Sequence, residues 1–292
     1  SKDINKAIRD LSFRDFILFN DSDMFRSYHL NEMLKPIISI YYSRDNLMAY
    51  KYWSKHGRSM EPALIKKSNL GVANSEYLAN YAKQYNINSF NVGQGCDLSV
   101  FDPDKKRSIP DDIRVIKKPV IGYIGAILSL RLDLSLLIEL CRKKSEWSFV
   151  FIGKADREFE NSALKDFSNV HFLGLKEESL LPDYLAQFDV AINPQCINEY
   201  TIGNYPRKID EYLAMGKPVV ATETMTMNLF RDFTYLGKTS DEYITLIEKA
   251  LKENNPDLQK QRIQFARTHT WENSVNAIGK AIIGLTPDLN RD

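Results

Sequence analysis

The second half of the sequence alternates short apolar runs with longer amphipathic stretches, and this alternation limits the folds that the chain can adopt. β-Rich runs separated by helical segments are typical of βαβ units around a parallel sheet. The runs are largely apolar, as expected when helices cover both faces of a sheet. The predicted strands are 119–125, 148–153, 170–174, 189–194, 217–222 and 234–237, and the predicted helices are 132–144, 157–167, 178–188 and 206–215. The pattern predicts a doubly wound α/β domain.

The first half repeats this rhythm less regularly and predicts a second α/β domain. Its predicted strands are 15–20, 36–42, 70–74 and 90–93, and its predicted helices are 4–11, 46–55, 61–67 and 76–84, the last capped by Ser75. The polar, proline-bearing residues 98–118 are interpreted as a linker. From Ser240, a candidate helix cap, the pattern is helical and closes on an amphipathic helix. The expected division is therefore a first domain at 1–97, a linker at 98–118, a second domain at 119–270, and a C-terminal helix at 271–285 that packs back toward the first domain.

Composition excludes several classes of protein. The 39 basic residues balance the 38 acidic ones, so the chain lacks the basic excess of a nucleic-acid binder. The longest mostly apolar run, 119–130, is shorter than the ~20 residues that span a bilayer. The three cysteines are widely spaced and odd in number, which favours a reducing compartment over a disulfide framework or a zinc site.

The predicted helix at 206–215 is the most informative element for function. Pro206 suits the first helical position, and Arg207 and Lys208 follow it in the first turn, where cations oppose the helix dipole. A bound anion would reverse that sign, because helix N-termini present free N–H groups to phosphates. Glu211 lies on the same face as Lys208 and suits sugar hydroxyls. This arrangement fits a nucleotide diphosphate; the alternative is a surface Lys208–Glu211 pair beside a solvated Arg207.

Other chemistry has weaker support. In open parallel sheets ligands bind beyond the carboxyl ends of the strands, where this sequence places 125–131, Lys154 and the loop 199–204. Gly122 and Gly125 lack the third glycine of a dinucleotide fingerprint, and no P-loop is present. The four histidines show no metal-ligand spacing, and His171 in a predicted strand is interpreted as a packed residue.

Taken together, these residues resemble the nucleotide-sugar-dependent glycosyltransferases with two Rossmann-like domains, the GT-B architecture. The resemblance is closest to glycosyltransferase family four and its bacterial relatives in capsule and teichuronic-type polysaccharide assembly. The stretch 205–222 carries most of it and matches the pattern Pro-x-Lys-x-x-Glu-Tyr-x-Ala-x-Gly-x-Pro-Val-Val. Weaker matching stretches are 72–76, 95–101, 122–125, 170–175, 188–194 and 270–275.

The resemblance implies roles for individual residues. Glu211 would bind the ribose hydroxyls of the donor, and Lys208 and Arg131 would face the diphosphate and stabilise the departing nucleotide. Gly125 would admit the donor phosphates and Lys154 would add charge, with the base near Leu175. The loop residues that would hold the donor sugar are Glu199, Thr201 and Asn204, of which Glu199 is also a candidate catalytic residue beside Arg131 and Lys208.

The sequence departs from the family pattern at two places. Many relatives carry an acid eight residues before the equivalent of Glu211, where this chain has Gly203, and an arginine where it has Ala126. The alternative for Glu199 is an exposed loop acid without a role. The first domain also has fewer strands than the family's usual six or seven and lacks a glycine-rich acceptor loop. We therefore expect about 80–100 residues to be missing from its start, given usual domain sizes, and such a fragment could bind nucleotide yet transfer no sugar.

The resemblance implies a hexosyltransferase, retaining the anomeric configuration, that moves a sugar from a UDP or GDP donor to a glycan or lipid-linked acceptor in surface polysaccharide synthesis. It implies a bacterial, cytoplasmic enzyme without a metal or permanently bound cofactor. Two alternatives stay open: a GT-B-fold nucleotide-sugar epimerase, and a non-catalytic module that binds a nucleotide or glycan.

Membrane contact is a separate hypothesis. The stretch 41–67 carries six basic residues, Arg44, Lys51, Lys55, Arg58, Lys66 and Lys67, among tyrosines and Trp53. Such a surface could rest on anionic headgroups at the inner face of the membrane, next to a lipid-linked acceptor. The alternative is a solvated helix with its aromatic side chains packed inward.

Overall fold

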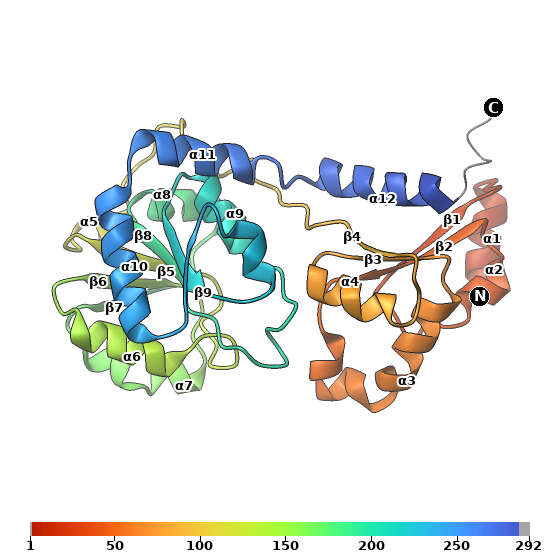
Figure 1. The fold of residues 1–292 in the computed structure, drawn as a ribbon, viewed down its shortest axis with the longest axis horizontal. Coiled ribbons are helices and arrows are strands. Elements are labelled where there is room, and N and C mark those ends of the chain that lie inside the picture. The colour runs from red at the N-terminus through yellow and green to blue at the C-terminus, as the bar shows by residue number, and fades with distance from the viewer. Residues whose placement is uncertain (1, 286–292) are drawn as a thin grey trace. The chain divides into compact units, whose positions relative to one another are not determined.

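The computed structural model describes residues 2–285, which cluster into two compact units. The first unit comprises 2–95, 202–205 and 271–285, and the second comprises 96–201 and 206–270. Each is an α/β unit with its own parallel sheet (Figure 1). No helix in 2–285 is long and apolar enough to cross a bilayer.

The first unit holds a four-stranded sheet in the order β1-β2-β3-β4, all pairs parallel. Every residue of β2 is buried, because helices cover both faces of the sheet. One face packs against the apolar side of α12, through Ala277, Ile278 and Ala281, and the other packs against α3 and α4 (Figure 1). The elements are α1 (Lys2–Asp10), β1 (Ile17–Asp21), α2 (Leu30–Leu34), β2 (Ile38–Ser43), η1 (Leu47–Ala49), α3 (Lys51–Lys67), β3 (Leu70–Ala73), α4 (Glu76–Lys83), β4 (Ser89–Asn91) and α12 (Trp271–Leu285).

The second unit is built on a six-stranded parallel sheet in the order β10-β9-β8-β5-β6-β7. Its strands are β5 (Val120–Ile124), β6 (Ser148–Ile152), β7 (Val170–Gly174), β8 (Val190–Asn193), β9 (Val219–Thr222) and β10 (Tyr235–Gly237). The chain runs outward from β5 through β6 to β7, then returns to β8 on the other side of β5. The topological switch point, where such sheets bind ligands, is therefore between β5 and β8.

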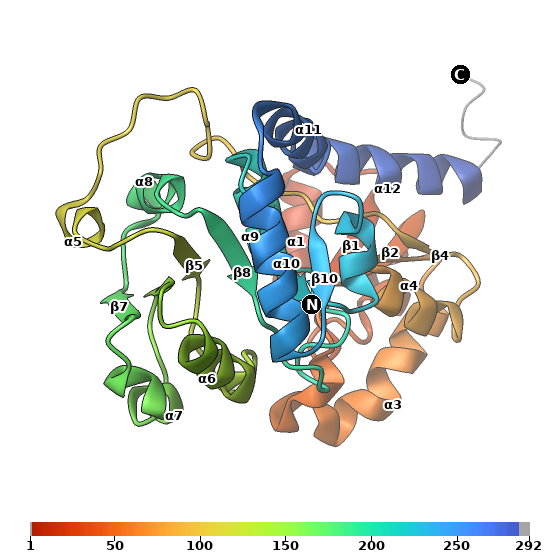
Figure 2. The same ribbon diagram turned by 60° about the vertical axis from the view of Figure 1, so that its left-hand side comes forward.

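Helices cover both faces of the second sheet. α6 (Leu134–Lys143) and α10 (Ser240–Glu253) lie together on one face, where their leucines, isoleucines and Tyr243 form one core with Ile121 and Tyr123 (Figure 2). On the opposite face Gly122 contacts the ring of Phe188, which follows α8. The remaining elements are α5 (Asp111–Arg114), α7 (Arg157–Glu160), η2 (Ala163–Asp166), η3 (Glu178–Leu180), α8 (Leu181–Ala186), α9 (Arg207–Ala214), η4 (Thr226–Phe230) and α11 (Pro256–Ala266).

The predicted helix 61–67 is helical and ends where predicted, but the break that separates it from the predicted helix 46–55 is wrong: both belong to a single helix, α3, which starts at Lys51 and is preceded by the short η1. Pro62 lies inside α3 and leaves the carbonyl of exposed Arg58 without its helical donor. The helix continues because Glu61, Leu64 and Ile65 are buried along its inner face, and this packing outweighs the cost of the proline.

Three further helix predictions need correction. The stretch 157–167 divides into α7 and η2, because Ser162 caps a new turn through the N–H of Leu164. The stretch 178–188 divides into η3 and α8, with Pro182 in the first turn of α8. α10 is capped by Thr239 rather than Ser240: the Thr239 hydroxyl accepts from the N–H of Glu242, whose carboxylate accepts from the N–H of Thr239.

Residues 98–118, predicted as a linker, belong to the second unit and pack against its α8. Arg107 forms an ion pair of 3.2 Å with Asp183 of α8, and both side chains are largely buried. Asp112 accepts a hydrogen bond from Tyr184 and pairs with Lys176 at 2.6 Å. These contacts fix α5 onto the edge of the unit at α8.

Candidate functional site

Two glycines shape the carboxyl edge of the second sheet. Gly125 follows β5 with φ +140°, and Gly153 follows β6 with φ +143°, both in backbone conformations that favour glycine. A Cβ on Gly153 would lie 1.9 Å from the carbonyl oxygen of Gly125, so the two turns touch backbone to backbone. The N–H of Gly125 donates to Ile152 and that of Gly153 donates to Gly174, which extends the ladder beyond the strands. The two glycines contribute no side chain to this edge, so their backbone can approach a ligand closely.

α9 brings its first turn to this edge because Tyr212 fixes it to β5. The Tyr212 hydroxyl is fully buried, accepts from the N–H of Ile124 at 2.8 Å and donates to its carbonyl at 3.1 Å. Both backbone groups at the end of β5 are thereby satisfied by one side chain from α9. Because Lys208 precedes Tyr212 by one helical turn, the same anchor sets the position of Lys208.

Lys208 lies over the turn at Gly125. Its Nζ donates to the Tyr123 hydroxyl at 2.8 Å and lies 4.5 Å from the centre of that ring. A Cβ on Gly125 would be 3.1 Å from this Nζ. The Tyr123 hydroxyl in turn donates to the carbonyl of Ala126 at 3.0 Å. The structure therefore holds an ammonium against a bare backbone turn at the switch point, an arrangement suited to an anion.

Glu211 lies one residue before Tyr212 and is four-fifths buried. Burial raises the pKa of its carboxyl above the ordinary value, against the lowering effect of the cations Arg207 and Lys208. Its Oε1 is 3.9 Å from an Arg207 guanidinium nitrogen, while Arg207 itself is more than half exposed. Lys208 and Glu211 are not the simple surface pair of the alternative interpretation, since Lys208 bonds Tyr123. A partly buried carboxylate beside cations is equipped to accept hydrogen bonds from hydroxyl groups.

Asp210, between Lys208 and Glu211 in sequence, is directed into the protein and is fully buried. Its carboxylate lies 2.6 Å from Nδ1 of His269 and accepts from the Cys96 thiol at 3.2 Å. Burial, with the adjacent Asp210 charge, raises the pKa of the Cys96 thiol, which stays protonated. Asp210 thus ties α9 to the two ends of the second unit's chain.

A mostly apolar pocket of about 440 Å³ opens beside Gly153 and Gly174, beyond the ends of β6 and β7. It contains two of the predicted residues, Lys154 and Leu175, both exposed, with Leu175 at 79%. Phe159 and Phe172 form its apolar wall, and Phe172 stacks on Phe151 at 5.3 Å. The size and lining suit a flat heterocycle with one polar edge.

The structure does not gather all the predicted residues. Arg131 is exposed after β5, and Glu199 is exposed in the loop that follows β8. Thr201 is buried, and its hydroxyl donates to the carbonyl of Cys196 and accepts from the N–H of Asn198, so it fixes its own loop. Asn204 belongs to 202–205, which clusters with the first unit. Pro206 is the N-cap of α9 rather than its first residue.

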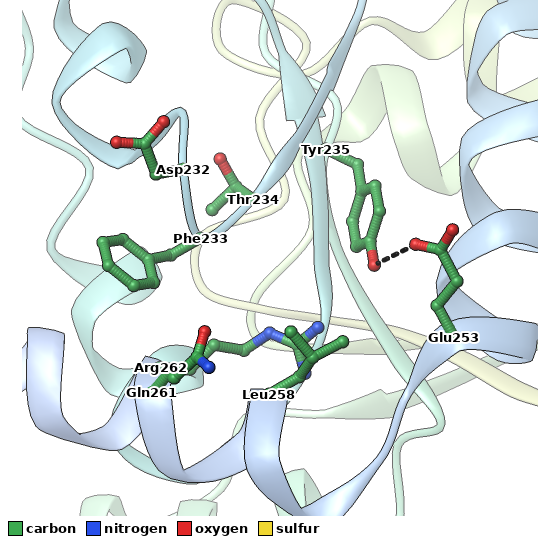
Figure 3. Close-up of a pocket in the computed structure, with 8 residues that line it drawn as sticks. All are labelled: Asp232, Phe233, Thr234, Tyr235, Glu253, Leu258, Gln261 and Arg262. Carbon is green, nitrogen blue, oxygen red and sulfur yellow. Dashed lines mark hydrogen bonds between the residues drawn. The ribbon is translucent and has the colours of Figure 1, made fainter.

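A second cavity in this unit, of about 210 Å³, lies between β10, α10 and α11 (Figure 3). It holds Asp232, Glu253 and the guanidinium of Arg262, which already donates to Asn254 and to the carbonyl of Gly216. The Tyr235 hydroxyl donates to Glu253 at 3.3 Å. With its cation engaged and two acids nearby, this cavity is unsuited to a diphosphate.

The sheets and the solved structures they resemble define the class of fold. The chain is similar to HepE of Anabaena in complex with UDP, with a TM-score of 0.73 at 15% identity over 97% of this chain and 82% of that chain. It is also similar to a glycosyltransferase of Rickettsia africae, with a TM-score of 0.72 at 14% identity over 100% of this chain and 81% of that chain. The fold is α/β with two Rossmann-like units, as in GT-B glycosyltransferases.

Sequence comparison adds a family match within the second unit and a relative that matches most of the chain. Residues 118–249 match the family model described as glycosyl transferases group 1. The chain is 26% identical over 243 residues to TuaH of Bacillus subtilis (strain 168), a protein assigned to teichuronic acid biosynthesis as a glycosyltransferase. That match covers 78% of this chain and 60% of TuaH. The matched family segment contains Gly125, Lys154, Leu175, Lys208 and Glu211.

Proposed function

We propose that this protein is a glycosyltransferase that moves a sugar from a nucleotide-diphosphate donor to a glycan or glycolipid acceptor in the synthesis of a surface polysaccharide. The observation that carries the proposal is the ammonium of Lys208 held over the bare turn at Gly125, beside the partly buried Glu211. The match to glycosyl transferases group 1 over 118–249 supports it, as does the similarity to TuaH.

The proposed donor site uses the contacts of the second unit. Lys208 holds the diphosphate and stabilises the charge that develops as the nucleotide departs. Glu211 accepts hydrogen bonds from the ribose, and the pocket at Lys154 and Leu175 receives the base. Arg131 adds a second cation, and Glu199, Thr201 and Asn204 lie in the loop that we assign to the donor sugar. HepE was solved with UDP, which supports a UDP donor over GDP.

The family, the stereochemistry and the cellular compartment of the reaction are proposed from the same resemblance. We propose a family-four hexosyltransferase that retains the anomeric configuration and acts in the bacterial cytoplasm. The three cysteines, all free thiols, support a reducing compartment. Proton NMR of the product's anomeric signal against that of the donor tests retention, and an inverted product would overturn it.

The donor site is tested by calorimetric titration with UDP, GDP, dTDP and ADP. We expect selective binding of one nucleotide, about tenfold or more weaker in Lys208→Met and Glu211→Gln, because each variant loses a charged hydrogen-bonding group. The matched control Glu248→Gln removes a carboxylate from α10 and should bind like the wild type. Equal binding by all four proteins, or no binding by the wild type, would contradict the assignment of the site.

Acceptor dependence separates the alternatives. A glycosyltransferase forms a new glycoside only with an acceptor, whereas an epimerase isomerises the donor without one, and a non-catalytic module binds without turnover. Incubation of the selected nucleotide sugar with and without an acceptor glycan, followed by chromatography, distinguishes the three.

We also propose that α3 rests on anionic lipid next to a lipid-linked acceptor. Lys51, Lys55 and Tyr52 are exposed, Tyr52 at 75%, and the acid of α3, Glu61, is buried. Most other aromatic side chains of 41–67 pack inward, with Trp53 stacked on Phe25. The wild type should float with phosphatidylglycerol vesicles, and the double variant Lys51→Glu/Lys55→Glu should not. The control Lys249→Glu/Lys252→Glu should float like the wild type. Failure of the wild type to float would contradict the hypothesis.

A further inference from the structure

The first unit contains a cavity that the donor site does not use. It has a volume of about 360 Å³ and lies where β2 ends, between η1, α3 and α4. This volume is near the lower end of the ~300–1,000 Å³ typical of small-molecule sites, so it suits one small ligand. Like the donor site, the cavity is next to the carboxyl end of a parallel strand, here at Ser43.

A buried carboxylate forms the inner wall of this cavity. Glu61 is 3% exposed, and its two carboxylate oxygens accept from the hydroxyls of Tyr41 at 2.8 Å and Tyr81 at 3.3 Å. The phenols thus fix the carboxylate on the cavity side of α3. Two donors do not exhaust the acceptor capacity of a carboxylate, which has about four lone-pair sites, so Glu61 retains capacity for a ligand.

The outer wall supplies the complementary donor and an apolar surface. Arg58 lines the cavity one helical turn before Glu61, and within residues 2–285 its side chain has no hydrogen bond or ion pair. Tyr77 and Tyr81 of α4, with Tyr85 in the turn just after it, line this side of the cavity, and the rings of Tyr81 and Tyr85 meet edge to face at 5.4 Å. Phenol rings present an apolar face and a polar tip to the same ligand.

The balance of charge selects the class of ligand. Arg58 is offset by Asp45 and Glu61, so the lining has no cationic excess for a diphosphate. A sugar hydroxyl both donates and accepts hydrogen bonds, and a pyranose ring has apolar C–H faces. Carboxylate, guanidinium and tyrosine rings around one small cavity match these requirements together.

We propose that this cavity binds one neutral hexopyranose unit of the acceptor glycan. Arg58 and Glu61 hold its hydroxyls, and Tyr77, Tyr81 and Tyr85 cover its apolar face. The acceptor role rests on the function proposed above, whereas the sugar site itself rests on the cavity.

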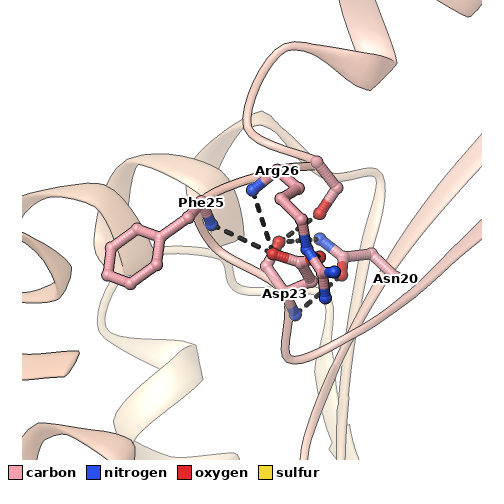
Figure 4. Close-up of polar contacts among 5 residues, drawn as sticks. Asn20, Asp23, Phe25 and Arg26 are labelled. Carbon is pink, nitrogen blue, oxygen red and sulfur yellow. Dashed lines mark hydrogen bonds and ion pairs between the residues drawn. The ribbon is translucent and has the colours of Figure 1, made fainter. Parts of the chain in front are cut away.

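Saturation-transfer NMR with methyl β-D-glucopyranoside, methyl β-D-galactopyranoside and methyl N-acetyl-β-D-glucosaminide tests the sugar site directly. We expect millimolar binding of at least one glycoside, weakened about tenfold in Arg58→Met and severalfold in Tyr85→Ala. The matched control is Arg26→Met: Arg26 lies on the same unit but pairs with Asp23 at 2.8 Å, within the turn that Asn20 and Phe25 complete (Figure 4).

Nucleotide titration of the same samples separates the two proposals. Glycoside binding that depends on Arg58, in a protein that also binds its nucleotide, supports both. Arg58-dependent glycoside binding without nucleotide binding keeps the sugar site and removes the acceptor role. If no glycoside receives saturation from the protein, or if Arg58→Met and Arg26→Met bind equally well, the proposed sugar site is wrong. Either result leaves the proposed donor site unaffected.

Discussion

Glu211 occupies a position where burial and neighbouring charge act on its pKa in opposite directions, and burial has the larger effect. Between the ordinary value of 4.5 and the raised value, the folded protein binds more protons at this group than the unfolded chain. The free energy of unfolding therefore falls as the pH rises through that interval, and the cost persists at neutral pH. The donor-binding role that we propose for Glu211 therefore carries a cost in stability.

Glu211→Gln should remove that cost. We expect the variant to match the wild type at about pH 4 and to be more stable at about pH 7, while its nucleotide binding is weakened about tenfold or more. Urea unfolding at both values measures the difference. A variant that is less stable than the wild type at neutral pH would show that the carboxylate stabilises the fold.

Gly153 illustrates a backbone requirement at the same site. Alanine there meets the Gly125 carbonyl at 1.9 Å and must adopt φ +143°, so Gly153→Ala should lose about 1–3 kcal/mol or more of stability. In contrast, Gly279 lies in α12 with nothing within 4 Å of an added Cβ, and Gly279→Ala should gain up to ~1 kcal/mol. Thermal unfolding of the two variants should show shifts of opposite sign.

At the scale of elements, α3 shows how packing overrides a local signal. Pro62→Ala restores a backbone donor inside the helix and should raise the free energy of unfolding by about 1–3 kcal/mol, after the loss of proline's restriction on the unfolded chain. Pro256 lies in the first turn of α11, where no donor is needed, so Pro256→Ala should change stability little. Denaturant unfolding compares them; equal effects would show that Pro62 carries no helical cost.

The sequence predicted the helices and strands that have a local pattern. It did not predict contacts between residues that are far apart in the chain. The strand 170–174 is confirmed at both ends: the polar Asn169 precedes it and Gly174 closes it. Lys154 and Leu175 were predicted near the nucleotide, and the structure brings both to one pocket. Tyr123 and Tyr212 were missed as site residues, because their bonds to Lys208 and Ile124 join residues 85 and 88 positions apart. Such pairs leave no periodic signal in a single sequence.

For the whole molecule, ligand binding should be visible in the unit that holds the site. Addition of the selected nucleotide should slow amide hydrogen exchange in 122–131, 153–156 and 206–212, because binding stabilises the local fold by mass action. Exchange measured by mass spectrometry, with Lys208→Met as the control, tests this. Protection that persists in Lys208→Met, or that is confined to the first unit, would place the nucleotide elsewhere.

The short segment 202–205 clusters with the first unit although the chain on either side of it belongs to the second. Ser75 donates to the carbonyl of Gly203 at 2.8 Å, and the ring of Tyr77 packs against Gly203. Neither unit is therefore a continuous stretch of the gene. Chimeras that exchange the second unit between relatives need junctions at 95/96, 201/202, 205/206 and 270/271, and a single crossover would transfer a unit together with a fragment of its neighbour.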